Sequence, residues 1–331
     1  FNMELNDDSI RYVCNRFQFV LNSQEFCLLG IRGALPVTAL VGKPEKGYSF
    51  SSSHELSAVE INYTSACCTI AIWNIQTQKL AVFPGSTLPS TEYLTRMPQK
   101  RAEFNILCPG NYTLSKGLHP RNSNFLQYPA LLMNGQAMVY KPQLVRVSSG
   151  LDFSFEKAKH QVVFAGDNLH ATGYEPSIGE NEISILNMPV DSSGCITVCG
   201  CPQLYQRNQY SSSHWNSWHF FYHFLNKQES IDYSFTLFNL KDFIHTEESK
   251  GKIALRYGSE GETVYELQNI LSQSWDARTG APYYEGEPDG KLRNKSASSA
   301  YEFYQNISLT KIGSTISFEK IKSKIKHFAI T

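Results

Sequence analysis

The sequence lacks long hydrophobic runs, an excess of charge of either sign and a large share of glycine or proline. Its longest apolar stretches, 26–31 and 67–73, are far shorter than the ~20 residues that a membrane-spanning helix needs. With 30 basic and 30 acidic residues the formal net charge is +0, so no basic surface for nucleic acid or anionic lipid is expected. The 21 glycines and 14 prolines among 331 residues are too few for a fibrous or broadly disordered chain. These absences predict a folded, soluble protein with no membrane span and no nucleic-acid partner.

The first residues and the cysteines narrow the class further. Residues 1–8 contain no basic segment followed by an apolar core, so they predict no secretion signal. The 8 cysteines are too few for a fold built on disulfides, and they lack the paired C-x-x-C spacing of a structural zinc site. A metal site stays open as an alternative in one region, where cysteines precede histidines: Cys195, Cys199, Cys201, His214, His219 and His223. The three histidines lie among aromatic residues, which indicates a buried environment. A buried thiol usually behaves as a small hydrophobic side chain, so neither a metal nor another cofactor is expected.

The hydrophobic pattern changes twice along the chain. Helical spacing of apolar residues behind an Asp/Ser cap predicts a short helix over 8–20. From 26 to 243, short β-branched and aromatic runs between turn residues predict strands at 26–31, 67–74, 79–83, 110–114, 137–140, 161–164, 183–186, 195–198 and 233–238. After a polar stretch at 247–252, helical spacing returns at 262–271, 296–305 and 316–325. The prediction is an α+β protein with an N-terminal helix and extension (1–25), a mainly β domain (26–246) and a small three-helix domain (250–331).

The segment Ser192-Ser193-Gly194-Cys195 is the strongest candidate for chemistry. A glycine beside a thiol at the edge of a predicted strand leaves the sulfur open to approach, and the adjacent backbone N–H groups can face a developing oxyanion. A nucleophilic cysteine also needs a base or a cation to generate its thiolate. His170, just after a predicted strand, is the best candidate for this base, because partners that are distant in sequence can meet in space.

The region from 26 to 201 resembles the catalytic domain of L,D-transpeptidases, in a divergent branch. The signature of that family is a histidine followed, after a variable insert, by Ser/Thr-His-Gly-Cys, which His170 and Ser192-Ser193-Gly194-Cys195 match. Further matches follow the family order: Gly30-Ile31-Arg32-Gly33, Val82-Phe83-Pro84-Gly85-Ser86-Thr87, Pro109-Gly110-Asn111-Tyr112, Gly117-Leu118-His119 and Tyr128-Pro129-Ala130-Leu131. The resemblance implies a β-rich catalytic domain with a cysteine nucleophile and no cofactor.

The sequence departs from the family at two positions near the thiol. Ser193 stands in place of the second histidine of the motif, and Thr197 in place of the Arg or Asn often found two residues after the cysteine. Other groups must then orient the substrate, although Arg32 can equally brace a turn and His119 can equally fill a loop. The resemblance implies four catalytic residues: Cys195, His170, Gly194 and Ser193. It also implies four substrate-binding residues: His119, Arg32, Tyr128 and Thr197.

The C-terminal segment resembles a second family, the three-helix peptidoglycan-binding domain. Leu255-Arg256-Tyr257-Gly258-Ser259-Glu260-Gly261-Glu262 matches its start, and Asp289-Gly290-Lys291-Leu292 and Ala300-Tyr301-Glu302-Phe303 match its second half. Gly258 and Gly261 permit tight turns, and Glu262 favours a helix N-terminus. Aromatic residues in the insert between the halves can stack on sugar rings, or can cap a small core: Trp275, Tyr283 and Tyr284.

Together the two resemblances imply a peptidoglycan-modifying cysteine enzyme in the periplasm or secreted to the cell wall. Its partners would be peptidoglycan stem peptides and glycan. Cys195 would attack an L,D peptide bond, and the thioester would pass to an amine (transpeptidation or D-amino-acid exchange) or to water (L,D-carboxypeptidase hydrolysis). Two alternatives stay open: a non-catalytic peptidoglycan-binding structural protein, and an exported antibacterial toxin or phage-type wall enzyme with a possible immunity protein.

Overall fold

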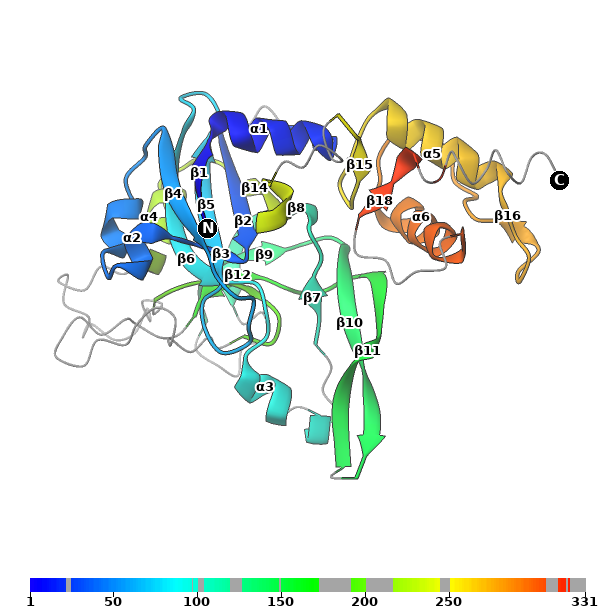
Figure 1. The fold of residues 1–331 in the computed structure, drawn as a ribbon, viewed down its shortest axis with the longest axis horizontal. Helices are drawn as coiled ribbons and strands as arrows, with labels where there is room; N and C mark the ends of the chain where they lie inside the picture. The colour runs from blue at the N-terminus through cyan, green and yellow to red at the C-terminus, as the bar shows by residue number, and fades with distance from the viewer. Residues whose placement is uncertain are drawn as a thin grey trace.

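A closed eight-stranded β-barrel forms the centre of the protein (Figure 1). The computed structural model describes residues 1–21, 25–96, 98–100, 104–119, 127–148, 150–172, 192–200, 217–244, 251–307, 315–319 and 321. The barrel strands follow the order β12-β13-β6-β5-β2-β14-β8-β9, and an antiparallel pair between Leu169 and Leu131 closes the ring. Their bounds are β2 (Phe26–Arg32), β5 (Cys68–Asn74), β6 (Lys79–Ser86), β8 (Gly110–His119), β9 (Tyr128–Met133), β12 (Leu169–Ala171), β13 (Ile196–Val198) and β14 (Asp232–Asn239).

The mainly β, α+β class predicted from the sequence is confirmed. Every predicted strand that falls within the described residues overlaps an observed one, although several observed strands extend further. The strand predicted at 183–186 lies outside the described residues. Among the helices that the structure describes, none is long and apolar enough to cross a membrane.

Alternate side chains of the central strands pack on opposite faces, and both faces are covered. In β5, Ile70 and Ile72 belong to the core inside the barrel, whereas Ala71 and Trp73 belong to a second core outside it. All four side chains are fully buried. Because burial of one large aliphatic side chain stabilises the fold by about 1.5–3 kcal/mol, the central strands are held from both sides.

The N-terminal segment covers the outer face. Its helix α1 (Asp7–Arg16) begins with a capping box, in which the Ser9 amide donates to Asn6 Oδ1 (2.9 Å) and the Asn6 amide donates to Ser9 Oγ (3.1 Å). The helix ends before the predicted end at 20, because Gln18 adopts a left-handed conformation with φ 53°. The neighbouring elements are β1 (Asn2–Asn6), β3 (Ala34–Pro36), α2 (Val37–Leu40), η1 (Pro44–Gly47) and β4 (Ser53–Ala58). The three strands among them form a sheet in the order β1-β4-β3.

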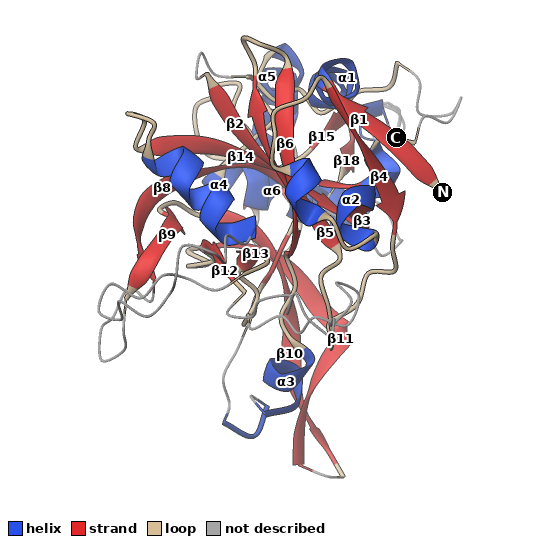
Figure 2. Ribbon diagram, turned by 90° about the vertical axis from the view of Figure 1, so that its left-hand side faces the viewer, coloured by secondary structure: helices blue, strands red, loops and turns tan. Residues whose placement is uncertain are grey.

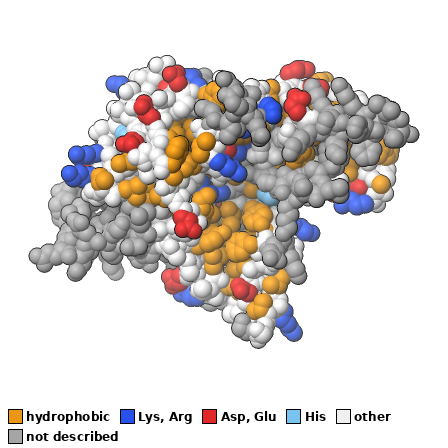
Figure 3. Space-filling view, viewed as in Figure 1, with side chains coloured by type: hydrophobic (Ala, Val, Ile, Leu, Met, Phe, Trp, Pro, Cys, Tyr) orange, Lys and Arg blue, Asp and Glu red, His pale blue; other side chains and the backbone are white. Residues whose placement is uncertain are grey.

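A long hairpin extends away from the barrel (Figure 1). Aromatic rings pack against the part of β11 near the turn, where Phe104 lies edge-on against Phe153 at a centroid distance of 4.6 Å. Figure 3 shows hydrophobic side chains gathered on this face over β7 and β10. The elements of this region are α3 (Thr91–Arg96), η2 (Pro98–Lys100), β7 (Ile106–Leu107), β10 (Ala137–Val147) and β11 (Gly150–Val163).

Helix α4 (Ser217–Asn226) packs on the barrel, on the side that faces the viewer in Figure 2. Phe221 meets Phe83 edge-on at 5.4 Å, and Phe224 meets Phe26 edge-on at 5.0 Å. The chain then enters β14 and the short turn η4 (Leu240–Asp242).

The C-terminal segment contains helices α5 (Glu262–Gln273) and α6 (Asn294–Ile307), which confirm the predictions at 262–271 and 296–305. The helix predicted over 316–325 is wrong at its start, because Ile316 and Ser317 form β18. This strand pairs with β15 (Ala254–Leu255) and buries Ile316 completely, while 322–325 lie outside the described residues. Two further short strands form a hairpin after α5: β16 (Trp275–Asp276) and β17 (Ala281–Pro282).

The C-terminal segment shares its core with the barrel. Two guanidinium nitrogens of Arg256 donate to the Asp242 carboxylate at 2.8 and 2.9 Å, and both side chains are buried. Gly258 has φ +89°, and a Cβ there would lie 2.3 Å from the carbonyl oxygen of Asn111, so the contact requires glycine. Removing 250–331 would leave Asp242 buried without its partner, so the role of this segment is best tested by point substitutions.

Candidate functional site

Two short parallel strands place the candidate base and nucleophile side by side in the sheet. β12 and β13 pair with Leu169 opposite Ile196 and His170 opposite Thr197. Leu169 and Ile196 point into the barrel core, so His170 lies on the other face of the sheet, with Thr197. Cys195 immediately precedes Ile196, whose amide donates to the carbonyl of Asn168 at 2.9 Å. The structure therefore brings the two predicted residues to the same strand pair, one on each strand.

The ring of His170 has a defined tautomer. Its Nδ1 lies 2.6 Å from the carbonyl oxygen of Ala171 and 3.2 Å from the Tyr128 hydroxyl. A carbonyl only accepts hydrogen bonds, so Nδ1 carries the proton and Nε2 keeps its lone pair. Burial and the neighbouring His119 lower the pKa of His170 to about 3, so the ring is neutral near pH 7. A neutral ring with a free Nε2 lone pair is the form that can accept a proton.

His119 lies directly against His170. The two rings stack at a centroid distance of 4.3 Å with only 8° between their planes. The side-chain amide of Asn168 donates to Nδ1 of His119 at 3.1 Å, and burial lowers the pKa of His119. The predicted residues His119, Tyr128 and His170 thus form one cluster, which joins the ends of β8, β9 and β12.

The loop before Cys195 is shaped by hydrogen bonds and by one glycine. Gly194 has φ +123°, and a Cβ there would lie 2.1 Å from the carbonyl oxygen of Asn105, so only glycine fits. The Gly194 amide donates to Ser192 Oγ (3.1 Å), and this hydroxyl donates to the carbonyl of Cys195 (3.0 Å). The expectation that Gly194 offers its amide to an oxyanion therefore requires correction, because that amide already has an acceptor. The Cys195 amide is the remaining candidate donor.

The thiol of Cys195 is buried and protonated at rest. Burial and the carboxyl group of Asp167 raise its pKa to about 12, while the backbone amides of Asn168 and of Cys195 itself oppose this rise. Within the described residues, no hydrogen bond joins the Cys195 sulfur to His170. Any thiolate must therefore form during the reaction, by proton transfer to a base, and is not present as a resting ion pair.

Two further groups face the thiol that the sequence analysis missed. Asp167 is 5% exposed, its Oδ2 has no hydrogen-bond partner among the described residues, and burial raises its pKa well above the usual range. Tyr93 of α3 lies beside Ser193, and the side chain of Ser193 is exposed. Burial and the nearby Cys195 raise the pKa of the Tyr93 phenol. An acid three residues before the candidate base was the available signal for Asp167. Tyr93 carries no local signal, because only the fold brings α3 to this loop.

We expect the Asp167→Asn substitution to lower the pKa of the Cys195 thiol, because it removes a negative neighbour and keeps the shape of the side chain. A shift of about one unit would raise the rate of alkylation by iodoacetamide about tenfold, since the thiolate is the reacting form. Mass spectrometry of the peptide that contains Cys195, from about pH 7 to pH 10, measures this rate. Asp152→Asn, at an exposed carboxylate on β11, is the matched control. Equal rates in the two variants would contradict a carboxylate beside the thiol.

Two of the predicted substrate-binding residues have structural roles. The buried guanidinium of Arg32 donates from Nε to Thr87 Oγ1 (2.8 Å) and from Nη2 to the carbonyl of Leu107 (2.9 Å). Thr197 is fully buried, and its hydroxyl donates to the carbonyl of Ser86. The contacts of Arg32 fit the alternative in which it braces a turn. Neither Arg32 nor Thr197 presents an open binding surface.

The aromatic residues of the C-terminal insert differ in exposure. Trp275 is 66% exposed on β16 and offers a ring to solvent. Tyr283 packs edge-on against Phe303 at 5.0 Å, and its hydroxyl accepts a hydrogen bond from Asn306 (2.9 Å). Tyr284 is buried in the main core, so it caps this core and does not present its ring.

Among the described residues, no group of three or more His, Cys, Asp or Glu side chains is arranged to hold a metal ion. His219 and His223 both lie on α4, whereas Cys201 and His214 lie outside the described residues. No protein-family model matches the sequence, and neither a curated protein nor a solved structure matches it significantly.

Proposed function

We propose that the protein is a cysteine enzyme that cleaves L,D peptide bonds in peptidoglycan stem peptides through a thioester intermediate. The observation that carries the proposal is the strand pair β12–β13, which places a tautomerically fixed, neutral imidazole on one strand and the Cys195 thiol at the start of the next. The sequence resemblances supply the substrate class. The periplasm or the cell wall is the matching location.

In this mechanism the proton transfer accompanies the attack. The Cys195 sulfur attacks the carbonyl carbon of the peptide bond while Nε2 of His170 takes the thiol proton. The Cys195 amide donates to the oxyanion, a contribution of about 2.7–4 kcal/mol for one good donor. His170 then returns the proton to the leaving amine, and the C–N bond breaks to leave a thioester. An incoming amine or water attacks the thioester and restores the thiol.

Burial raises the pKa of the Cys195 thiol to about 12 and lowers that of the His170 ring to about 3, and both shifts oppose transfer of the proton from Cys195 to His170. The proposal therefore requires bound substrate to change the surroundings of both groups. The same burial, with no hydrogen bond between Cys195 and His170, favours a second candidate function. This candidate is a non-catalytic peptidoglycan-binding protein in which Cys195 is a structural thiol.

The Cys195→Ala variant tests the proposed function. Purified peptidoglycan and tetrapeptide muropeptides are incubated with each protein, and the products are identified by mass spectrometry. We expect loss or exchange of the terminal D-amino acid, or new L,D cross-links, with the wild-type protein only. Cys199→Ala, at another fully buried thiol, should retain the activity. No change in any muropeptide with the wild-type protein, together with binding to intact peptidoglycan, would instead support the binding protein.

A further inference from the structure

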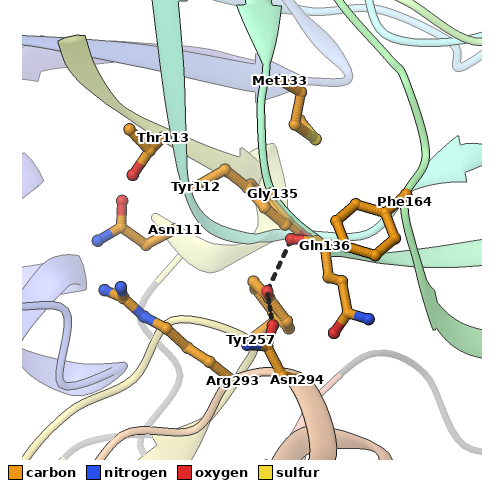
Figure 4. A pocket seen from close by; sticks show the side chains of 10 residues that line it. All are labelled: Asn111, Tyr112, Thr113, Met133, Gly135, Gln136, Phe164, Tyr257, Arg293 and Asn294. Atoms are coloured by element: carbon orange, nitrogen blue, oxygen red, sulfur yellow. Dashed lines mark hydrogen bonds between the residues drawn. The ribbon is translucent and has the colours of Figure 1, made fainter.

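A pocket of about 430 Å³ lies where the C-terminal segment meets the barrel (Figure 4). One wall comes from the start of β8 and the end of β9 with the turn that follows it. The opposite wall comes from Tyr257 and from the first turn of α6. Its lining is amphipathic and includes Asn111, Gln136, Phe164, Tyr257, Arg293 and Asn294.

Asn111 supplies a fixed hydrogen-bond donor. Its side chain is 8% exposed, and its Oδ1 accepts from Ser234 Oγ (2.8 Å) and from Thr236 Oγ1 (3.3 Å). This orientation leaves the Nδ2 group for the pocket, and none of the described groups accepts a hydrogen bond from it. Figure 4 shows this nitrogen turned toward the guanidinium of Arg293. A donor with no acceptor among the described residues marks a place where a ligand can gain a hydrogen bond.

Arg293 adds a positive charge beside this donor. Its Nη2 donates to Glu260, and the other guanidinium nitrogens have no acceptor among the described residues. Its side chain is 42% exposed, so a ligand can reach it. A guanidinium with unused donors favours a carboxylate as its partner.

The apolar parts of the pocket are rigid. Tyr257 stacks on Tyr112 at 5.2 Å with 15° between the ring planes, and its hydroxyl donates to the carbonyl of Gln136 (2.7 Å). Phe164 is 77% exposed at the rim, which is unusual for a large aromatic side chain. An exposed ring beside amide groups is the surface that a pyranose ring can stack on while its polar substituents are hydrogen-bonded.

We propose that this pocket binds an acetamido sugar that carries a carboxylate, with the acetamido oxygen on Asn111, the carboxylate on Arg293 and the sugar ring on Phe164. In peptidoglycan this chemistry belongs to a muramic acid unit that no longer carries its stem peptide, because the stem peptide is otherwise joined through this same carboxyl group. This part of the proposal rests on the proposed function. The site differs from the aromatic insert expected from the sequence, because Trp275, Tyr283 and Tyr284 do not line it.

Two hydrogen bonds through Asn168 link the lining of the pocket to the segment that contains the candidate thiol. Met133 lines the pocket, and its amide donates to the side chain of Asn168 (3.3 Å). The backbone carbonyl of Asn168 accepts the amide of Ile196, directly after Cys195. A glycan strand held here at a peptide-free muramic acid would raise the local concentration of the stem peptides that neighbouring units of the same strand carry.

Calorimetric titration of the full chain with the disaccharide N-acetylglucosaminyl-N-acetylmuramic acid tests the proposal. We expect saturable binding that weakens at least about tenfold in Arg293→Gln, the effect of losing one charge-assisted hydrogen bond. Asn111→Asp keeps the Oδ1 acceptor but places a negative charge at the donor position, so it should abolish binding. Phe164→Ala should weaken binding about tenfold. Tyr265→Ala, at an exposed aromatic residue on α5 outside the pocket, is the matched control and should bind as the wild type does.

Unfolding curves confirm that each variant is folded before its affinity is compared. Diacetylchitobiose, which lacks the carboxylate, should bind more weakly, and equal affinity would overturn the role of Arg293. Loss of binding in Trp275→Ala with normal binding in the pocket variants would overturn the proposed location. Absence of any disaccharide binding, with Cys195-dependent cleavage of muropeptides intact, would overturn the pocket proposal and leave the proposed function standing.

Discussion

The His170→Gln variant is expected to lose about 10²- to 10⁴-fold in the rate of L,D bond cleavage, the usual contribution of a positioned general base. Glutamine can donate to the carbonyl of Ala171 as the ring does, but it cannot accept the thiol proton. Initial rates on a soluble tetrapeptide muropeptide measure the loss. His54→Gln is the matched control, because His54 is also a partly buried histidine with a lowered pKa, and it lies on β4, away from the thiol. A His170→Gln rate within tenfold of the control would remove His170 from the mechanism.

The same variant has a second readout, in its stability. The pKa of His170 falls from 6.5 in the unfolded chain to about 3 in the folded protein. Between these pH values the unfolded chain binds a proton at His170 that the folded protein does not bind. The contribution of His170 to the free energy of unfolding is therefore complete above pH 6.5 and is lost as the pH falls toward 3. The free energy of unfolding of His170→Gln should therefore fall less on acidification than that of the wild type. Urea denaturation at about pH 7 and pH 4.5 measures the difference.

Asp242→Ala is expected to reduce the free energy of unfolding by about 3–5 kcal/mol, because it leaves the buried Arg256 without its counterion. The pair is almost inaccessible, with side-chain exposures of 2% for Arg256 and 5% for Asp242. The guanidinium also lies 3.8 Å from the ring centroid of Phe17 in the segment after α1. Loss of Asp242 therefore affects the barrel, the N-terminal segment and the C-terminal segment together.

Guanidinium chloride denaturation of the full chain measures this effect. Lys295→Ala removes the exposed pair between Lys295 and Glu285 and should change the stability by less than about 1 kcal/mol. If Asp242→Ala lowered the free energy of unfolding no more than Lys295→Ala does, the ion pair between Asp242 and Arg256 would contribute little to the fold.

Local sequence patterns were sufficient for the strands β2, β5, β6, β8, β10, β11, β13 and β14 and for the helices α1, α5 and α6. They did not predict the other strands or the helices α2, α3 and α4. The runs at 26–31 and 67–74 are apolar on both faces because the barrel has a core on each side, and such runs predict strands regardless of topology. The closure of the barrel by Leu169 and Leu131 has no local signal, because it depends on pairing between distant strands. The error at Ile316 has a related cause, since its helical spacing yields to the pairing of β18 with β15.

The candidate site follows the same division. Cys195 and His170 stand in short motifs with chemical meaning, so the sequence indicated them. The pocket could not be predicted, because Asn111 and Arg293 are far apart in the sequence and meet only when the C-terminal segment packs on the barrel. The structural role of Arg32 was equally hidden, since its acceptors Thr87 and Leu107 lie on other segments.

The position of β14 between β2 and β8 has a consequence for synthesis. β2 pairs in parallel with β14, which lies roughly 200 residues later in the chain, and at typical translation rates this separation is on the order of 10 to 40 s. During that interval one edge of a strand that is entirely buried in the final fold has no partner. Non-local pairing of this kind slows folding and exposes an edge that other chains can join. The barrel therefore closes only after β14 has been synthesised, and until then the edge of β2 is open to pairing with other chains.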